Sequence, residues 1–314
     1  MPDVGCLSLR PFVLLLNTIK AHSAVLGTNL FFAINYSLIK FVSPSLAGPF
    51  AVTLLRSGGS LLLFWLAWFF EKGPAGIHKK DIGRFAACGI LGIAINQMLF
   101  IKGLTLTSTI HASLLTLATP LLVTVFALWV LKEGFTLYKA LGLLLGIGGA
   151  LLLILQKQGG DSSPDYLYGD LLILLNAIAY AGYFILVKPL TEKYSPLHVV
   201  RWAFTFGCIL VLPFSWKETA AIHWAAFDAA HAVALIVVVV AGTFLAYYFN
   251  AYAIDKLGPA ISGTYIYTQP LFAVLIATLL LGESMTVQKI LAALLIFGGV
   301  YLVSFQPRRR KDMK

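Results

Sequence analysis

The sequence has few charged residues and few cysteines, and each shortage excludes a class of protein. Charged residues make up 11% of the 314 positions and hydrophobic residues 59%, whereas soluble domains carry about 25% charged residues. A soluble helical bundle would need polar helix faces that this chain lacks. Three cysteines without metal-ligand spacing provide neither a disulfide framework nor a zinc site. No short alternating strands are present, which excludes a membrane β-barrel.

Motifs for nucleotide-driven or metal-dependent chemistry are missing as well. The chain has no GxxxxGK[ST] phosphate-binding loop and no soluble domain that could house one. Acidic residues are missing from the centres of the apolar runs, and no nucleophile is paired with a base near the membrane interface. We therefore expect no cofactor, no metal and no enzymatic activity.

Apolar runs of membrane-spanning length are abundant. A hydrocarbon core of about 30 Å takes about 20 helical residues to cross, because unpaired backbone groups are not tolerated there. Ten such runs predict an all-α integral membrane protein with ten transmembrane helices. The predicted helices are 21–41, 46–70, 84–104, 108–131, 137–156, 168–188, 196–215, 231–253, 259–281 and 287–305.

The net charge of +10 falls on one side of this arrangement. With a cytoplasmic N-terminus, the cytoplasmic side holds 17 of the 23 Lys and Arg residues, while the 13 acidic residues divide into seven and six. Cytoplasmic loops of membrane proteins carry such an excess of Lys and Arg. We therefore expect both termini in the cytoplasm and the protein in the cell membrane or a bacterial inner membrane. The expected partner is the lipid bilayer and not nucleic acid.

The chain also repeats itself at an offset of 150 residues. Pro120, Glu133, Thr136, Lys139 and Gly148-Gly149 recur as Pro270, Glu283, Thr286, Lys289 and Gly298-Gly299. Five helices separate equivalent points, and an odd number means that the second copy enters the membrane from the opposite side. Inverted repeats of this kind are typical of transporters, in which the pathway lies between the halves near the membrane midplane.

The repeat predicts two five-helix halves with short flanking segments. Residues 21–156 form the first half and residues 168–305 the second, joined by a linker at 157–167. Residues 1–20 are expected to be a cytoplasmic N-terminal segment, and residues 306–314 a basic cytoplasmic tail.

Several local patterns support a family resemblance. They are Pro120-Leu121 with Glu133-Gly134, Pro270-Leu271 with Glu283-Ser284, Arg56 with Arg201, and Asn250-Ala251-Tyr252-Ala253 leading into Leu257-Gly258-Pro259-Ala260. Together they resemble the EamA-type ten-helix members of the drug/metabolite transporter (DMT) superfamily. The resemblance covers residues 21–305 and implies two EamA-like inverted five-helix repeats that move metabolites, with export favoured. Helix one departs from the family pattern, because it lacks the Trp-Gly pair often found there.

Polar side chains in the predicted helices are the candidates for a transport pathway. They are costly in lipid and should face the bundle interior or a wet cavity. Tyr265 and Gln269, four residues apart, are expected to share a helix face. The candidate pathway residues are Asn29, Asn96, Gln97, Thr116, Tyr180, Tyr183, Tyr247, Asn250, Tyr265 and Gln269, with Asn35, His111, Thr119, Asn176, Tyr248 and Tyr252 as a supporting set. The alternative is that such groups only hydrogen-bond helix to helix.

Two repeat-related pairs have alternative roles. Pro120 and Pro270 either bend their helices around the bundle axis or act as gating hinges. Glu133 and Glu283 lie at predicted helix ends. We expect them to be caps or hairpin ties, with the lysine six residues further on as a candidate partner, rather than coupling groups.

The cationic side chains also have two interpretations. Arg56 lies midway along the second helix, too deep to reach the interface, and is either an internal structural tie or an attractor of anionic solutes. Lys102 either extends to the interface or attracts an anion. His111 is expected to be an interior histidine rather than a proton relay, and Asp170 to complement a helix dipole. The lack of central acids disfavours organic cations as substrates.

These features favour a membrane transporter, either an exporter or a facilitator. The expected solute is a small amphipathic metabolite, such as an amino acid or a related compound, carried by alternating access. The alternatives are an integral membrane enzyme acting on lipid-linked substrates and a non-transporting receptor or structural protein. The sequence leaves open whether a proton is the coupling ion and how many copies assemble.

Overall fold

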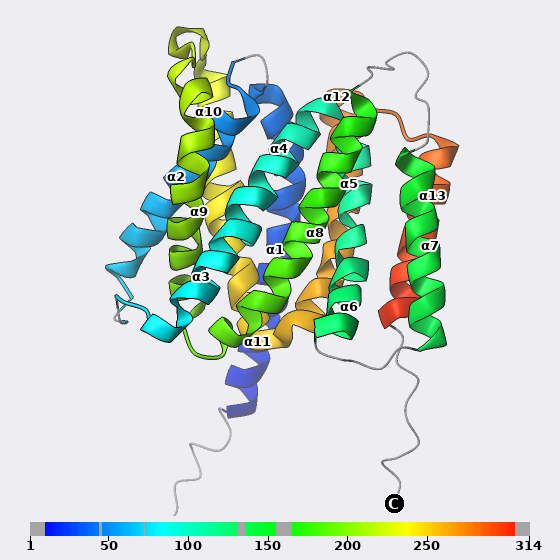
Figure 1. The fold of residues 1–314 in the computed structure, drawn as a ribbon, viewed down its shortest axis with the longest axis horizontal. Coiled ribbons are helices and arrows are strands. Elements are labelled where there is room, and N and C mark those ends of the chain that lie inside the picture. Colours follow the sequence, from blue (N-terminus) through cyan, green and yellow to red (C-terminus); the bar gives the residue numbers. More distant parts are fainter. Residues whose placement is uncertain are drawn as a thin grey trace, which may run out of the picture.

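The fold is a bundle of helices that run along a common direction (Figure 1). The computed structural model describes residues 10–43, 46–71, 73, 75–130, 136–154 and 165–304. Within these ranges, six helices are long and apolar enough to cross a membrane, and four shorter apolar helices accompany them. Together they account for the ten predicted runs, so the expected all-α, ten-helix architecture is confirmed.

The first half begins with the longest helix and contains one π-helical turn. Its elements are α1 (Arg10–Val42), α2 (Pro49–Trp68), the 3₁₀ turn η1 (Lys79–Asp81), α3 (Ile82–Gly89), the π-turn η2 (Ile90–Ile95), α4 (Asn96–Leu106), α5 (Thr109–Thr116), α6 (Ala118–Val130) and α7 (Leu137–Ile154). The third predicted span is therefore α3, η2 and α4 in succession, and the fourth is α5 with α6.

The second half repeats this order, with a π-turn in the corresponding place. Its elements are α8 (Tyr166–Thr191), α9 (Pro196–Ala220), the 3₁₀ turn η3 (Trp224–Ala226), α10 (Ala229–Val239), the π-turn η4 (Val240–Leu245), α11 (Ala246–Thr264), the 3₁₀ turn η5 (Tyr265–Tyr267), α12 (Thr268–Leu281) and α13 (Val287–Ser304).

Two helix boundaries differ from the sequence-based expectation. Helix α1 starts at Arg10 rather than near residue 21, and its first turns project beyond the bundle (Figure 1). Helix α11 continues to Thr264, where a break was expected between residues 253 and 259. Hydropathy marks only the apolar part of a helix, whereas an established helix gains a hydrogen bond with each added residue and so extends beyond that part.

The prolines of the repeat lie just after breaks in their spans. The fourth span is interrupted at Leu117, and Pro120 is the third residue of α6, which follows. Pro270 is likewise the third residue of α12, after the turn η5. Proline lacks the backbone N–H of a helix interior but is tolerated in the first turn. The position of both prolines therefore explains where these spans are divided.

The two halves interlock rather than lie side by side. Helix α1 packs on α11 and α12, α2 packs on α9, α4 on α8, and α5 on α12. Each of these contacts joins a helix of one half to a helix of the other. The centre of the bundle is therefore the interface between the halves.

Apolar side chains occupy both the interior and the outer surface. One core cluster includes Tyr36, Leu104 and Leu115, and a second includes Phe64 and Phe204. Large apolar side chains, including those of Leu62, Leu144 and Leu279, are exposed on the outside of the bundle. A surface of this kind is stable in contact with lipid but not with water.

Two glutamates of the second half cap helices of the first half. The Glu283 carboxylate accepts hydrogen bonds from the backbone nitrogens of Thr109 (2.9 Å) and Ile110 (3.0 Å) at the start of α5. Glu218 does the same for the first turn of α2, with an oxygen 2.7 Å from the nitrogen of Phe50. Acidic groups stabilise helix N-termini because they satisfy unpaired donors and complement the helix dipole.

The expected hairpin tie of Glu283 takes a different form. Its carboxylate lies 3.8 Å from Lys40 Nζ of the first half, while Lys289 Nζ donates to the carbonyl of Ser284 at 3.0 Å. Glu283 thus connects the two halves instead of closing its own hairpin. Its repeat partner Glu133 lies outside the described residues.

Helices α7 and α13 approach closely through glycine. A Cβ on Gly299 would lie 2.5 Å from the carbonyl oxygen of Gly142 and 2.6 Å from the nitrogen of Gly146. A Cβ on Gly298, its neighbour, would have no atom within 4 Å. Small residues allow helices in lipid to reach such close contact, where dispersion forces replace the hydrophobic effect.

This difference between neighbouring glycines gives a test of the α7–α13 contact. Gly299→Ala should destabilise the protein by about 1–3 kcal/mol, because the added methyl forces the two backbones apart. Gly298→Ala should be neutral or stabilising by about 0.5–1 kcal/mol, because alanine favours the helix. Thermal unfolding of the purified variants in detergent measures both, and equal melting temperatures would rule out the close packing.

Candidate functional site

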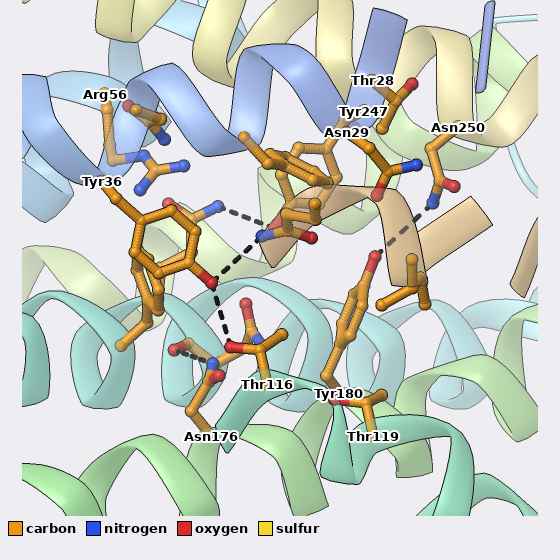
Figure 2. A pocket seen from close by; sticks show the side chains of 17 residues that line it. Thr28, Asn29, Tyr36, Arg56, Thr116, Thr119, Asn176, Tyr180, Tyr247 and Asn250 are labelled. Atoms are coloured by element: carbon orange, nitrogen blue, oxygen red, sulfur yellow. Dashed lines mark hydrogen bonds between the residues drawn. The ribbon is translucent and has the colours of Figure 1, made fainter. Parts of the chain in front are cut away.

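A polar pocket lies between the two halves, near the middle of the bundle. It contains about 700 Å³ of space not filled by atoms, part of it open to solvent. Seventeen side chains line it (Figure 2). Three are apolar, and the others are polar. The lining comprises Thr28, Asn29, Phe32, Asn35, Tyr36, Arg56, Asn96, Gln97, Phe100, Thr116, Thr119, Asn176, Tyr180, Tyr247, Asn250, Ile266 and Gln269.

The two π-turns come directly before polar lining residues. Residues 90–95 form η2 and residues 240–245 form η4, and the two ranges are separated by the repeat offset of 150. Asn96 and Gln97 are the first two residues after the first turn, and Tyr247 is the second residue after the second turn. A π-turn widens the helix and changes the direction of the side chains that follow, and such turns are frequent at functional sites.

The pocket contains the pseudo-two-fold axis of the repeat. Gln97 and Tyr247 are equivalent residues, 150 positions apart, and Gln97 Nε2 donates to the Tyr247 hydroxyl at 3.4 Å. Residues related by a two-fold rotation can contact each other only beside the axis. Ser57 also donates to Gln97 Oε1 at 2.9 Å, which fixes the orientation of the amide.

Tyr36 joins three helices at one side of the pocket. Its hydroxyl lies 3.0 Å from Thr116 Oγ1, and the amide nitrogen of Gln269 donates to it at 3.0 Å. The ring of Phe100 packs edge-on against the Tyr36 ring, with the ring centres 5.0 Å apart. Figure 2 shows these hydrogen bonds meeting at the Tyr36 hydroxyl. The fully buried Tyr36 therefore ties α1 to α5 and α12.

Several lining amides also bond helix to helix. Asn176 Nδ2 donates to the backbone carbonyl of Asn96 at 2.8 Å, and Asn250 Nδ2 lies 3.5 Å from the Tyr180 hydroxyl. Asn29 Nδ2 donates instead within α1, to the carbonyl of Val25 one turn earlier at 2.8 Å. Each amide uses part of its hydrogen-bonding capacity in these contacts. Packing and pocket lining are therefore combined in the same side chains.

Some sequence-derived candidates lie away from the pocket lining. Tyr183 is buried and stacks on Tyr180, with the ring centres 5.8 Å apart. The Tyr265 hydroxyl lies 2.7 Å from His22 Nδ1, whereas Gln269 lines the pocket. Both side chains contact α1, Tyr265 at His22 and Gln269 at Tyr36, but of the two only Gln269 belongs to the pocket lining. Lys102 is half-buried on α4 and is also outside the lining.

His111 forms a buried acid–base pair outside the pocket lining. Its Nδ1 lies 3.0 Å from Asp170 Oδ2, and both side chains are at most 1% exposed. The Thr107 hydroxyl donates to the other oxygen of Asp170, and the Tyr166 ring packs edge-on against the imidazole. Asp170 therefore binds two side chains of the first half, which replaces the role expected for it at the helix dipole.

Five lining residues were not among the sequence-based candidates. They are Thr28, Phe32, Tyr36, Phe100 and Ile266. Positions 29, 32 and 36 of α1 follow the spacing of one helix face, which extends the candidate Asn29 to Phe32 and Tyr36. Phe100 and Ile266 carry no such signal, because apolar residues in a membrane helix are equally suited to face lipid.

The chemistry of the lining suits binding rather than bond-making. Among the 17 lining residues there is one formal charge, the guanidinium of Arg56, and no carboxylate, histidine or cysteine. Within the described residues, no group of three or more His, Cys, Asp or Glu side chains is placed to hold a metal ion. A pocket of amides and hydroxyls can orient a small solute through hydrogen bonds.

Sequence comparison finds relatives of similar length. A protein of Bacillus subtilis named uncharacterized transporter YetK is 23% identical, with 80% of this chain and 76% of its own covered. An uncharacterized transporter of Archaeoglobus fulgidus is 25% identical, covering 91% and 97%. A WAT1-related protein of Arabidopsis thaliana is 24% identical, covering 87% and 79%. A solved crystal structure matches the fold with a TM-score of 0.61 at 17% identity, covering 90% of this chain and 96% of its own.

The model of the EamA-like transporter family matches the chain twice, at residues 19–155 and 167–305. The two matches include nearly all of the helical bundle, and the relatives named as transporters agree with them. The membrane-enzyme alternative is therefore excluded. The chain is an integral membrane transporter of the EamA-like family, within the drug/metabolite transporter superfamily.

Proposed function

We propose that the protein carries small amphipathic metabolites, such as amino acids or related compounds, through the pocket between its two halves. The observation that supports this most directly is the polar lining at the pseudo-two-fold axis, where Gln97 meets Tyr247. A site on that axis is bounded by both halves and can be exposed to either side when the halves move. Amides, hydroxyls and aromatic rings suit a solute with an apolar body and a few polar groups.

Alternating access is the mechanism that the contacts between the halves favour. At one end of the bundle, Glu283 and Glu218 cap helices of the first half. At the other end, Tyr194 donates to Asp81 at 2.9 Å, and Lys193 Nζ lies 3.1 Å from the same carboxylate. The halves are joined at each end by a few polar contacts that water can replace, so rocking of the halves can separate one end while the other stays in contact. The breaks before Pro120 and Pro270 provide positions for such bending.

Transport by the purified protein in lipid vesicles tests this proposal. Vesicles loaded with an unlabelled neutral amino acid should take up the labelled compound by counterflow, and no chemical product should form. Gln97→Met should lower the rate about tenfold, because a lost hydrogen bond of about 1.4 kcal/mol corresponds to that factor. Gln288→Met, on an exposed position of α13, serves as the matched control.

The outcomes of this assay separate the remaining hypotheses. Absence of counterflow across the proteinogenic amino acids would contradict the proposed solute class. Equal rates for Gln97→Met and Gln288→Met would show that the pathway lies elsewhere.

We propose that both termini are cytoplasmic. The excess of Lys and Arg on that side supports this orientation. Fusion of a fluorescent reporter that matures only in the cytoplasm should give a signal at the C-terminus. A periplasmic alkaline phosphatase fused at the same place should stay inactive, and the opposite pattern would reverse the orientation.

A proton is the coupling ion that we propose. The sequence suggested only an interior histidine at position 111, but Asp170 Oδ2 lies 3.0 Å from its Nδ1, and an imidazole in contact with a carboxylate can relay a proton. A pH gradient imposed across the vesicles should accelerate amino acid flux in the wild-type protein and have no effect in His111→Gln. Equal acceleration of both proteins would exclude this pair as the proton carrier, and no acceleration of the wild type would exclude the proton.

A further inference from the structure

Arg56 is a buried cation with an incomplete set of partners. Its side chain is 3% exposed, and its Nε donates to Thr243 Oγ1 at 3.1 Å. Nη1 has no hydrogen-bond partner among the described residues, and none of the ion pairs between them includes Arg56. A buried guanidinium without an acid is strongly unfavourable unless something else compensates its charge.

The Arg56 side chain belongs to the pocket lining. In Figure 2 it lies beside Tyr36 at one side of the pocket, while Asn250 and Tyr180 lie at the other side. The lining contains no carboxylate that could approach Arg56. The missing counter-charge can therefore come from a molecule that enters the pocket.

Asn35 provides a second buried atom without a hydrogen-bond partner. This atom is an acceptor, whereas Arg56 Nη1 is a donor. Its Nδ2 donates to the carbonyl of Gly242 at 3.4 Å, while Oδ1 has no partner among the described residues. Gly242 and Thr243 are consecutive residues of η4, so Asn35 and Arg56 are anchored side by side. A Cβ on Gly242 would lie 2.7 Å from Asn35 Oδ1, so only glycine leaves room for the amide. One side of the pocket thus offers a cationic donor and an acceptor together.

The π-turn η4 is what holds Arg56 in this position. The Thr243 hydroxyl donates to the carbonyl of Val238 at 2.8 Å, which leaves its oxygen to accept from Arg56 Nε. In the first half, the position 150 residues earlier is Ile93, which has no hydroxyl. Arg201, in the second helix of the second half, donates instead to the carbonyl of Ala75 at 3.1 Å. Among the described residues, the hydroxyl anchor of Arg56 has no counterpart at Arg201, so the repeated fold does not itself require it.

We propose that Arg56 and Asn35 form a subsite for a carboxylate group. This inference rests on the proposed function and narrows the class of solutes that the protein carries. Arg56 Nη1 donates to the carboxylate, and Asn35 Oδ1 accepts from an amino or hydroxyl group on the adjacent carbon. Guanidinium groups bind carboxylates more strongly than neutral donors do. A solute whose only charge is positive would meet the cation and no counter-charge, so the transporter selects carboxylates and zwitterions over amines.

Paired ligands that differ only at the carboxylate provide the test. Each proteinogenic L-amino acid is compared with its α-amide in two assays, thermal stabilisation of the purified protein and counterflow in vesicles. Wild type should bind and carry amino acids but not the matching amides. Arg56→Gln should weaken binding of the acids at least tenfold, and Arg56→Lys should weaken it less. Arg84→Gln, at an exposed arginine of α3, should behave as wild type.

The melting temperature without ligand separates a binding role from a structural tie. Removal of an uncompensated buried charge should leave the stability of Arg56→Gln unchanged or raise it. A purely structural bond to Thr243 predicts a lower melting temperature instead. Asn35→Asp supplies a carboxylate from within the protein beside Arg56, and it should raise the melting temperature and abolish binding of amino acids.

Different experimental outcomes would contradict the subsite and the proposed function. If the wild-type protein carries amides as well as acids, or if Arg56→Gln carries the acids unchanged, the subsite is wrong while transport stands. If the wild-type protein carries and binds neither the acids nor the amides, the proposed function fails and the subsite with it.

Discussion

Lipid offers no hydrogen bonds, so each polar group that this chain brings into the membrane needs a partner within the protein. The interlocked arrangement of the two halves provides many of these partners. Tyr36 binds Thr116 of its own half and Gln269 of the other, and Gln97 binds Tyr247. Because the Tyr36–Gln269 and Gln97–Tyr247 bonds join opposite halves, hydrogen bonds that make the polar centre stable also define the interface along which the halves can move.

The repeat explains the scaffold, and departures from it explain the site. Both halves carry a π-turn at equivalent positions, and both place a polar residue of the third or eighth span, Gln97 or Tyr247, near the axis. Thr243 in η4 has Ile93 as its equivalent, and this one difference allows the second-half turn to hold Arg56. The symmetry of the two halves is sufficient to give two similar conformations, one open to each side of the membrane. A solute is not symmetric, so its recognition requires residues that occur once.

The cost of polar groups in lipid was a good guide to the pocket but an incomplete one. It led to Gln97 and Tyr247, which the structure places in the lining. Amides and hydroxyls in the middle of an apolar helix avoid lipid and therefore face the bundle interior or a wet cavity. It also led to Tyr265, which contacts His22 and lies outside the lining. Tyr36 was overlooked, since a tyrosine near a helix end is equally suited to the membrane interface.

The sequence by itself determined the class of protein, the ten helices and the inverted repeat. These features depend on hydropathy and spacing, which are local properties of the chain. Tertiary structure alone decided that Glu283 caps a helix of the other half, that Asp170 binds His111, and that Arg56 has no acid beside it. Such pairings join residues from 59 to 174 positions apart. They depend on how helices rotate and pack against one another, which no pattern along the chain records.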